Sequence, residues 1–278
     1  MRFVTGPIHS LLRMPPRIWA AFFVLIAAGC ASGPPELPYP AFIQTQELDT
    51  IYLATMPGVY AKQLAGNPKT RRTSNQIDLP PGWQGTTGGA PGKALEIFVL
   101  AGDLDVSDFR LTAGGYAHVP PGTFGFNLKT AEGARILYFL DDVDPMAMIE
   151  TPTILDTGLV DWQPTDIAGI SIKVLRYDPG NGARTWLKKI EVGIDIPWQS
   201  SSAIREGYLT SGQYQNSECV NGESHTWIYT PGGYFYRPND TLSGGPEARA
   251  ISESIWVLRE TMASSEKIAD ACVIEPIS

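Results

Sequence analysis

The sequence repeats one short phrase in its two halves, and this repeat constrains the fold more than any other feature. The first copy spans residues 114–125 and reads Gly-Gly-Tyr, then a Pro, then Thr-Phe-Gly. The second copy spans residues 232–243 and reads Gly-Gly-Tyr, then a Pro, then Thr-Leu-Ser. Each copy combines a Gly turn, a strand and a Pro turn, which is typical of β-structure. A duplicated unit of about a hundred residues is therefore predicted.

The repeat continues outside this phrase. Residues 58–64 match residues 169–175, and both stretches alternate as half-buried strands do. Residues 96–102 match residues 206–212, and both read as a strand that ends in a Gly turn. Few stretches have a helical period, apart from a short helix predicted at residues 264–271. The duplicated unit is therefore predicted to consist almost entirely of strands.

Many short strands joined by Gly and Pro turns indicate a sandwich or barrel. The 28 glycines and 23 prolines are spread along the chain in agreement with this. Glu-x-Phe-Val-Leu-x-Gly at residues 96–102, followed by the Gly-Gly-Tyr phrase, resembles the motifs of the cupin superfamily. Over about residues 50–260 the chain resembles the double-cupin, or bicupin, families, particularly a bacterial family of unknown function. The resemblance implies an all-β fold of two tandem cupin-type jelly-roll β-barrels.

Four segments follow from this interpretation. Residues 1–29 are predicted to be a lipoprotein signal peptide, and residues 30–48 a Pro-rich tether that carries a lipid anchor. Residues 49–150 form the first cupin domain. Residues 151–278 form the second, with a C-terminal tail.

The predicted metal chemistry depends on histidines. In active cupins the first motif supplies His-x-His and a Glu, and the second motif supplies a third His. The resemblance places Gly125 and Ser243 at the position of this third His. If residues 1–29 are removed, the chain keeps two histidines, His118 and His225. No three-His site can then form within one chain.

The remaining ligand positions of the cupin motif also lack metal-binding residues. The carboxylate position holds Leu95 in the first half and Arg205 in the second, each followed by a Glu. The His-x-His positions fall within residues 88–92 and residues 198–202. An Arg that points inward would repel a cation. Both standard metal sites are therefore predicted to be lost, with no cofactor and no catalytic residue.

A weaker metal site is the alternative. Glu206, Glu218 and His225, with Tyr236 and water, could converge in the second barrel on one divalent Fe, Mn or Zn ion. That arrangement would support a cupin enzyme of the dioxygenase or isomerase type. Nothing in the spacing of these residues requires it.

The interior of the second barrel is the predicted ligand pocket. If Tyr234 and Tyr236 point inward, the pocket is aromatic and Arg205 could anchor a carboxylate or phosphate. The alternative is that the aromatic residues simply fill the barrel. The candidates are Trp198, Arg205, Glu206, Tyr208, Trp227, Tyr234 and Tyr236.

The N-terminal segment predicts a location. Residues 1–29 carry three arginines and then an uncharged apolar run that is too short to span a bilayer. The run ends Leu-Ile-Ala-Ala-Gly before Cys30, which resembles a bacterial lipoprotein signal and implies that Cys30 is acylated. Ala31 follows, where an inner-membrane retention signal would place Asp, so the resemblance favours a periplasm-facing lipoprotein of the outer membrane. An ordinary signal peptide with a chance Cys is the alternative, and Met14 is an alternative start.

Charge and cysteines agree with an envelope location. The whole chain has a net charge of −8, and residues 1–29 contribute three arginines and no acid to it. The acidic remainder would repel phosphate backbones, which argues against nucleic-acid binding. Cys219 and Cys272 remain as an even pair and are predicted to form a disulfide. Two unpaired buried thiols are the alternative.

Three functions remain open. The leading hypothesis is a lipid-anchored envelope bicupin that binds a small molecule or a protein partner without catalysis. The second is the metal-dependent enzyme described above. The third is a structural envelope protein that forms a homodimer, because cupins commonly associate edge to edge.

Overall fold

The computed structural model describes residues 33–67, 69, 72–88, 91–122, 125–143 and 151–273. Contacts divide the chain into Met1–Gly33 and Pro34–Ser278, and the strands discussed below all belong to the second unit. The predicted signal peptide and the predicted lipid attachment at Cys30 lie outside the described residues. In the part of the chain that is described, no helix has the length and apolar character needed to cross a membrane.

Barrel 1 is built on one antiparallel sheet of seven successive strands, with three further strands on its far side. In spatial order the seven are β11 (Thr153–Asp156), β8 (Gly115–Val119), β6 (Lys93–Val106), β10 (Ala134–Asp142), β4 (Arg72–Leu79), β3 (Tyr60–Asn67) and β2 (Ile51–Tyr52). The far side consists of β5 (Gln84–Thr87), β7 (Phe109–Thr112) and β9 (Phe126–Lys129).

Barrel 2 repeats this order. Its main sheet runs β1 (Ile43–Gln44), β19 (Gly233–Arg237), β16 (Arg205–Ser211), β21 (Ser254–Glu260), β14 (Arg184–Ile190), β13 (Ile170–Tyr177) and β12 (Gln163–Pro164). Its far side consists of β15 (Trp198–Ser201), β22 (Glu266–Ala269), β17 (Tyr214–Val220), β18 (Glu223–Tyr229) and β20 (Arg249–Ala250). The predicted all-β fold of two jelly-roll barrels is confirmed. The helix predicted at residues 264–271 is wrong, because β22 pairs there with β15.

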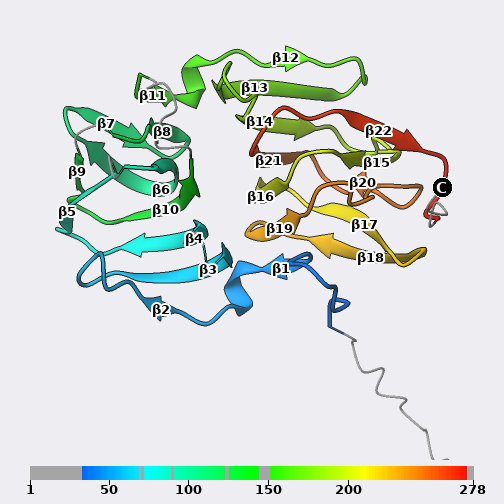
Figure 1. Ribbon diagram of the computed structural model, residues 1–278, viewed down its shortest axis with the longest axis horizontal. Helices are drawn as coiled ribbons and strands as arrows, with labels where there is room; N and C mark the ends of the chain where they lie inside the picture. The colour runs from blue at the N-terminus through cyan, green and yellow to red at the C-terminus, as the bar shows by residue number, and fades with distance from the viewer. Residues whose placement is uncertain are drawn as a thin grey trace, which may run out of the picture. The chain divides into compact units, whose positions relative to one another are not determined.

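Each barrel receives one strand from the chain segment that precedes the other barrel. β1 precedes barrel 1 in sequence but pairs with β19 of barrel 2, whereas β11 precedes barrel 2 but pairs with β8 of barrel 1. Figure 1 shows the blue β1 beside the orange β19. The short 3₁₀ turns η1 (Thr45–Glu47) and η2 (Thr157–Leu159) follow these strands. The exchange ties the two barrels together.

The predicted tether differs from the structure at its C-terminal end. Phe42 is 2% exposed in the core of barrel 2, and its amide donates a hydrogen bond to the Tyr229 hydroxyl. The amide of Tyr236 likewise donates to the carbonyl of Pro40. Within the predicted tether 30–48, the segment from Pro40 onward is therefore part of barrel 2, because an apolar side chain and an edge strand are buried there.

Three apolar clusters hold the molecule together. One fills barrel 1, a second fills barrel 2, and a third lies between the main sheets and includes Phe98, Tyr116, Tyr208 and Tyr234. The predicted disulfide between Cys219 and Cys272 is present and ties the segment after β22 to β17. The third cluster matters for function because it surrounds the buried charges described next.

Candidate functional site between the barrels

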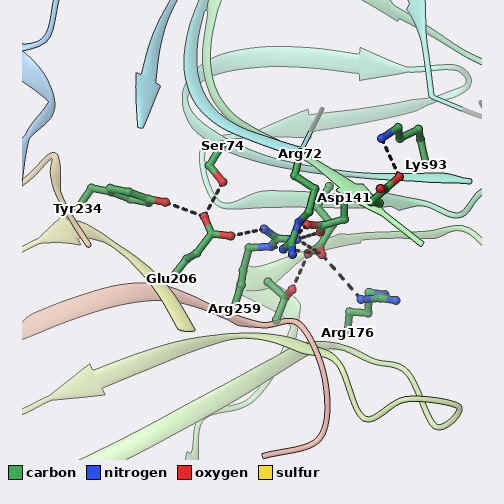
Figure 2. A network of polar contacts seen from close by, with 11 residues as sticks. Arg72, Ser74, Lys93, Asp141, Arg176, Glu206, Tyr234 and Arg259 are labelled. Carbon is green, nitrogen blue, oxygen red and sulfur yellow. Dashed lines mark hydrogen bonds and ion pairs between the residues drawn. The ribbon is translucent and has the colours of Figure 1, made fainter. Parts of the chain in front are cut away.

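Two glutamates occupy equivalent positions where the barrels meet. Glu206 on β16 accepts hydrogen bonds from the hydroxyls of Ser74 (2.5 Å) and Tyr234 (2.7 Å). Ser74 belongs to barrel 1 and Tyr234 to barrel 2, as Figure 2 shows. The carboxylate of Glu206 therefore links the two barrels.

Glu96 on β6 makes the equivalent contacts in the opposite direction. It accepts hydrogen bonds from Thr185 of barrel 2 (2.5 Å) and from Tyr116 of barrel 1 (2.6 Å). Both glutamates match in the sequence repeat and are almost fully buried. The interface therefore has an approximate two-fold symmetry that relates the two halves of the chain.

Arg259 breaks this symmetry. Its guanidinium donates to Glu96 (2.9 Å), to Glu206 (3.1 Å) and to Asp141. Asp141 also accepts a hydrogen bond from Arg72 at 3.0 Å, which extends the network toward the surface (Figure 2). One arginine at the centre therefore contacts carboxylates from both barrels.

The protonation states of Glu96 and of the two tyrosines follow from their surroundings. Burial would raise the pKa of Glu96, but Arg259 and Arg176 hold it well below its usual range. Burial, reinforced by the neighbouring glutamates, raises the pKa values of Tyr116 and Tyr234 far above their ordinary value. Glu96 is therefore ionised at neutral pH, while both tyrosines are neutral donors.

A cavity of about 690 Å³ opens at one end of the network, and we call it the inter-barrel cleft. Its walls come from both barrels. The polar wall includes Arg72, Glu96, His118, Asp141, Arg176 and Arg259, and the apolar wall includes Ala94, Pro121, Val143 and Met262.

A smaller cavity of about 220 Å³ occupies the symmetry-related end. There Tyr236 takes the place of His118, because Tyr236 pairs with Glu206 as His118 pairs with Glu96. Ala65 takes the place of Arg176, because these residues pair with Ser74 and Thr185 respectively. The two ends have therefore diverged, and the larger end has an imidazole and a guanidinium in addition.

His118 places an imidazole in the wall of the cleft. It is 1% exposed and lies opposite Glu96 on the neighbouring strand. Burial lowers its pKa to about 4, against the opposing effect of Glu96. The imidazole is neutral at pH 7 and can donate one hydrogen bond and accept another.

The interior of barrel 2 contains a separate cavity of about 40 Å³. Gln199, Arg205 and Ser243 line it, and all three belong to the positions at which a cupin would carry metal ligands. Lys188 and Arg237 line it as well. An amide, a hydroxyl and three cationic side chains do not fit a divalent cation. In barrel 1 the carboxylate position holds Leu95, which is fully buried in the apolar core.

The predicted pocket residues fall on opposite faces of one sheet. Arg205 lines the barrel cavity, whereas Glu206, Tyr208, Tyr234 and Tyr236 face the other barrel. Arg205 pairs with Arg237 on β19, and the two side chains therefore lie on the same face of the sheet. Because successive side chains alternate along a strand, Tyr236 faces the opposite side. The pocket with Tyr234 and Tyr236 pointing inward is therefore wrong. Two further candidates lie elsewhere: Trp198 is buried against Gly245, and Trp227 packs at the edge of the barrel 2 core.

The alternative metal site is also wrong. Glu218 and His225 are cross-strand neighbours on β17 and β18, but Glu206 lies on the outer face of β16. Glu218 instead accepts hydrogen bonds from Arg237, at 2.6 Å and 2.9 Å. Among the described residues, no group of three or more His, Cys, Asp or Glu side chains could hold a metal ion.

A family model for a domain of unknown function, DUF4437, matches residues 54–262. The chain belongs to the DUF4437 family. No curated protein sequence matches it significantly.

This DUF4437 protein has the fold of known cupin-type structures. It is similar to a proposed dioxygenase from Nostoc punctiforme, with a TM-score of 0.66, 21% identity, and coverage of 87% of this chain and 89% of that chain. The protein YlbA of Escherichia coli, from family DUF861, gives a TM-score of 0.65 at 15% identity, with 81% and 93% covered. A Lactobacillus farciminis oxalate decarboxylase in complex with formate gives a TM-score of 0.59 at 9% identity, with coverage of 81% of this chain and 87% of that chain.

These similarities correct one prediction. The sequence was expected to specify a protein without a cofactor, but its structural neighbours include oxalate decarboxylases and a proposed dioxygenase, which belong to a fold of metal-dependent enzymes. The loss of the usual ligands therefore does not establish that DUF4437 proteins work without a cofactor. It shows that the standard ligand positions of this chain are unsuited to a metal ion.

Several residues of the cleft were missed from the sequence. Arg72, Asp141, Arg176 and Arg259 come from four strands that are far apart in the chain. One signal was available, because Arg259 stands in the repeat where barrel 1 of this DUF4437 protein has Phe139. A charge that replaces an aromatic residue in a predicted strand indicates a polar partner on another element.

Proposed function

We propose that this DUF4437 protein binds a small organic molecule in the inter-barrel cleft without converting it. The observation that carries this proposal is the asymmetry of the interface. His118 and Arg176 contribute an imidazole and a guanidinium to the larger cavity. The equivalent positions at the smaller cavity hold Tyr236 and Ala65. A purely structural interface has no need for a cavity of about 690 Å³ at one end.

The size and lining of the cleft support a ligand site. Ligand pockets of about 300–1,000 Å³ often lie between domains and combine apolar walls with a few fixed polar groups. In this cleft Glu96 and Arg259 are already held by their mutual ion pair (2.9 Å). His118 adds a buried imidazole to the polar wall. A molecule with one apolar face and one hydrogen-bonding edge would match these walls.

The predicted leader adds a location to the proposal. A lipid on Cys30 would hold the protein at the bacterial envelope, facing the periplasm, at the outer membrane. The acidic composition and the disulfide between Cys219 and Cys272 support an oxidising, extracytoplasmic compartment. Metabolic labelling with a fatty acid tests this part: the intact chain should incorporate label and a Cys30→Ser variant should not.

Native mass spectrometry tests the ligand site. The chain is purified from its own cells and examined for a small molecule that remains bound. Arg176→Ala places in the inter-barrel cleft the residue type that Ala65 provides at the equivalent position of the smaller cavity. This variant should no longer retain the molecule. Arg110→Ala, an exposed arginine on barrel 1, is the matched control and should retain it. Retention by Arg176→Ala would contradict the assignment to this cleft.

An enzyme is the second candidate, favoured by the structural similarity to oxalate decarboxylases and a proposed dioxygenase. Elemental analysis of the chain purified without chelator distinguishes the two functions. About one metal ion per chain would favour the enzyme. Metal at trace level together with a bound organic molecule would favour binding.

A further inference from the structure

We propose that barrel 2 binds a small planar oxyanion of the carboxylate class inside the barrel, at the place where metal-binding cupins hold a cation. This site is separate from the inter-barrel cleft, since it lies on the opposite face of the main sheet. It rests on different residues, so it can fail or succeed independently of the function proposed above.

The comparison between the two barrels carries the argument. Arg205 pairs with Arg237 in barrel 2, and the equivalent strands of barrel 1 pair Leu95 with Val119. The position of Lys188 on β14 corresponds to that of Ile77 on β4, which is fully buried in the core of barrel 1. The three inward positions that are apolar in barrel 1 are therefore all cationic in barrel 2.

Two of these cations are held in place by carboxylates. Arg237 is bound by Glu218 through two of its nitrogens, with a closest distance of 2.6 Å. Arg205 is bound by Glu260 and Glu266, both at 2.6 Å. These pairs neutralise the guanidinium groups and fix their orientation toward the cavity.

Lys188 is the unmatched charge. Within the described part of the chain its ammonium makes no hydrogen bond or ion pair, although it lines the cavity beside Arg205 and Arg237. Burial, and then the charge of Arg205, lowers its pKa to about 8 against the opposing effect of Glu266, so it is largely protonated at pH 7. Lys188 is half-buried, and its protonated amine adds a positive charge beside two guanidinium groups that are already paired with carboxylates, so it would attract an anion into the cavity.

The cavity limits the size of that anion. Its volume is about 40 Å³, whereas one water needs roughly 10–15 Å³ of such space, so an anion of three or four heavy atoms fits. Gln199, Asn216 and Ser243 provide polar groups around it, and Trp256 and Phe235 provide flat apolar walls. Formate and bicarbonate match this space, and citrate does not.

Calorimetric titration of the full chain with formate, bicarbonate and citrate at pH 7 tests the proposal. Formate or bicarbonate should bind with saturation and citrate should not. Lys188→Met should weaken binding at least about tenfold, because it removes a charge-assisted contact. Lys189→Met, which removes the neighbouring cation on the other face of β14, should leave binding unchanged. Arg176→Ala should also leave it unchanged, which separates this site from the cleft.

Two results would overturn the proposal: no saturable binding of formate or bicarbonate by the unmodified chain, or equal binding by Lys188→Met and the unmodified chain. If Lys188→Met does not fold, the carbon resonance of ¹³C-formate decides. It should broaden or shift with the unmodified chain and recover when excess unlabelled bicarbonate is added. An unchanged resonance would count against the site.

Discussion

Arg259 stacks its guanidinium on the ring of Phe139, 4.3 Å from the ring centroid, although the two residues occupy the same position in the two repeats. Phe139 pairs with Ser74 and Glu96, and Arg259 pairs with Thr185 and Glu206. The two equivalent positions therefore meet where the barrels join. With Phe at both positions, Glu206 would lose the guanidinium that contacts it, and Glu96 would keep only the more distant Arg176, at 3.8 Å.

Arg259→Met should destabilise the protein by about 3–5 kcal/mol, because it leaves buried carboxylates without their partner. The free energy of unfolding in urea measures this effect. Arg249→Met, at an exposed position on β20, is the control and should change stability by less than about 0.5 kcal/mol. A loss below about 1 kcal/mol for Arg259→Met would show that Glu96 and Glu206 do not depend on the arginine.

Stability should fall on acidification, partly through His118. Burial lowers its pKa from 6.5 to about 4, so the unfolded chain binds the proton more readily between these values. Its contribution is fully present above pH 6.5 and is lost as the pH falls to about 4. The pKa of Glu96 is also lowered, so it adds a further loss below its ordinary value of 4.5.

His118→Gln should therefore flatten the dependence of unfolding free energy on pH between 6.5 and about 4. The His118 shift corresponds to about 3 kcal/mol over this window. Urea unfolding at several pH values, with the unmodified chain in parallel, gives the comparison. The same slope in both proteins would contradict the burial of a neutral imidazole.

Removing the disulfide should lower the unfolding free energy by about 4 kcal/mol, because the bridge closes a long loop of the unfolded chain. Cys219 and Cys272 are 53 residues apart. The double variant Cys219→Ser, Cys272→Ser can be compared with the oxidised protein by urea unfolding. Equal stability would mean that the bridge constrains neither state.

Two equivalent turn glycines should resist substitution, because each lacks room for a Cβ atom. Gly102 and Gly212 have φ values of 76° and 88°, and an added Cβ would collide with the backbone carbonyls of Gly133 and Glu253. Ala at either position should cost at least about 3 kcal/mol. Gly193 has a φ of 76° in open space, so Gly193→Ala isolates the backbone effect and should cost about 1 kcal/mol. Equal losses at all three positions would contradict the predicted collisions.

Much of the fold was predictable from the repeat, because matching residues have matching roles. Lys62 and Lys173 align in the sequence, and their ammonium groups donate to the carbonyls of Thr45 and Thr157 at 2.6 Å and 2.7 Å. The strand ending at Gly102 extends beyond the predicted turn, since β6 continues to Val106. Local pattern located the strands but not their full length, which depends on pairing with β7 and β9.

The site was less predictable, because it depends on strand register and on strand exchange. The pattern around Arg205 and Glu206 allows either residue to face inward, and a shift by one residue reverses the choice. The partner of Glu206 is Ser74 of the other barrel, which no spacing in the sequence connects to it. The packing of one barrel on the other decided which face became the site.

The location of a bound molecule in a crystal structure tests the proposed function most directly. The crystals should be grown from chain purified from its own cells and shown by native mass spectrometry to carry a small molecule. We predict electron density for an organic molecule in the inter-barrel cleft, in contact with His118 and Arg176. Water alone in the cleft, with the molecule bound elsewhere, would contradict it.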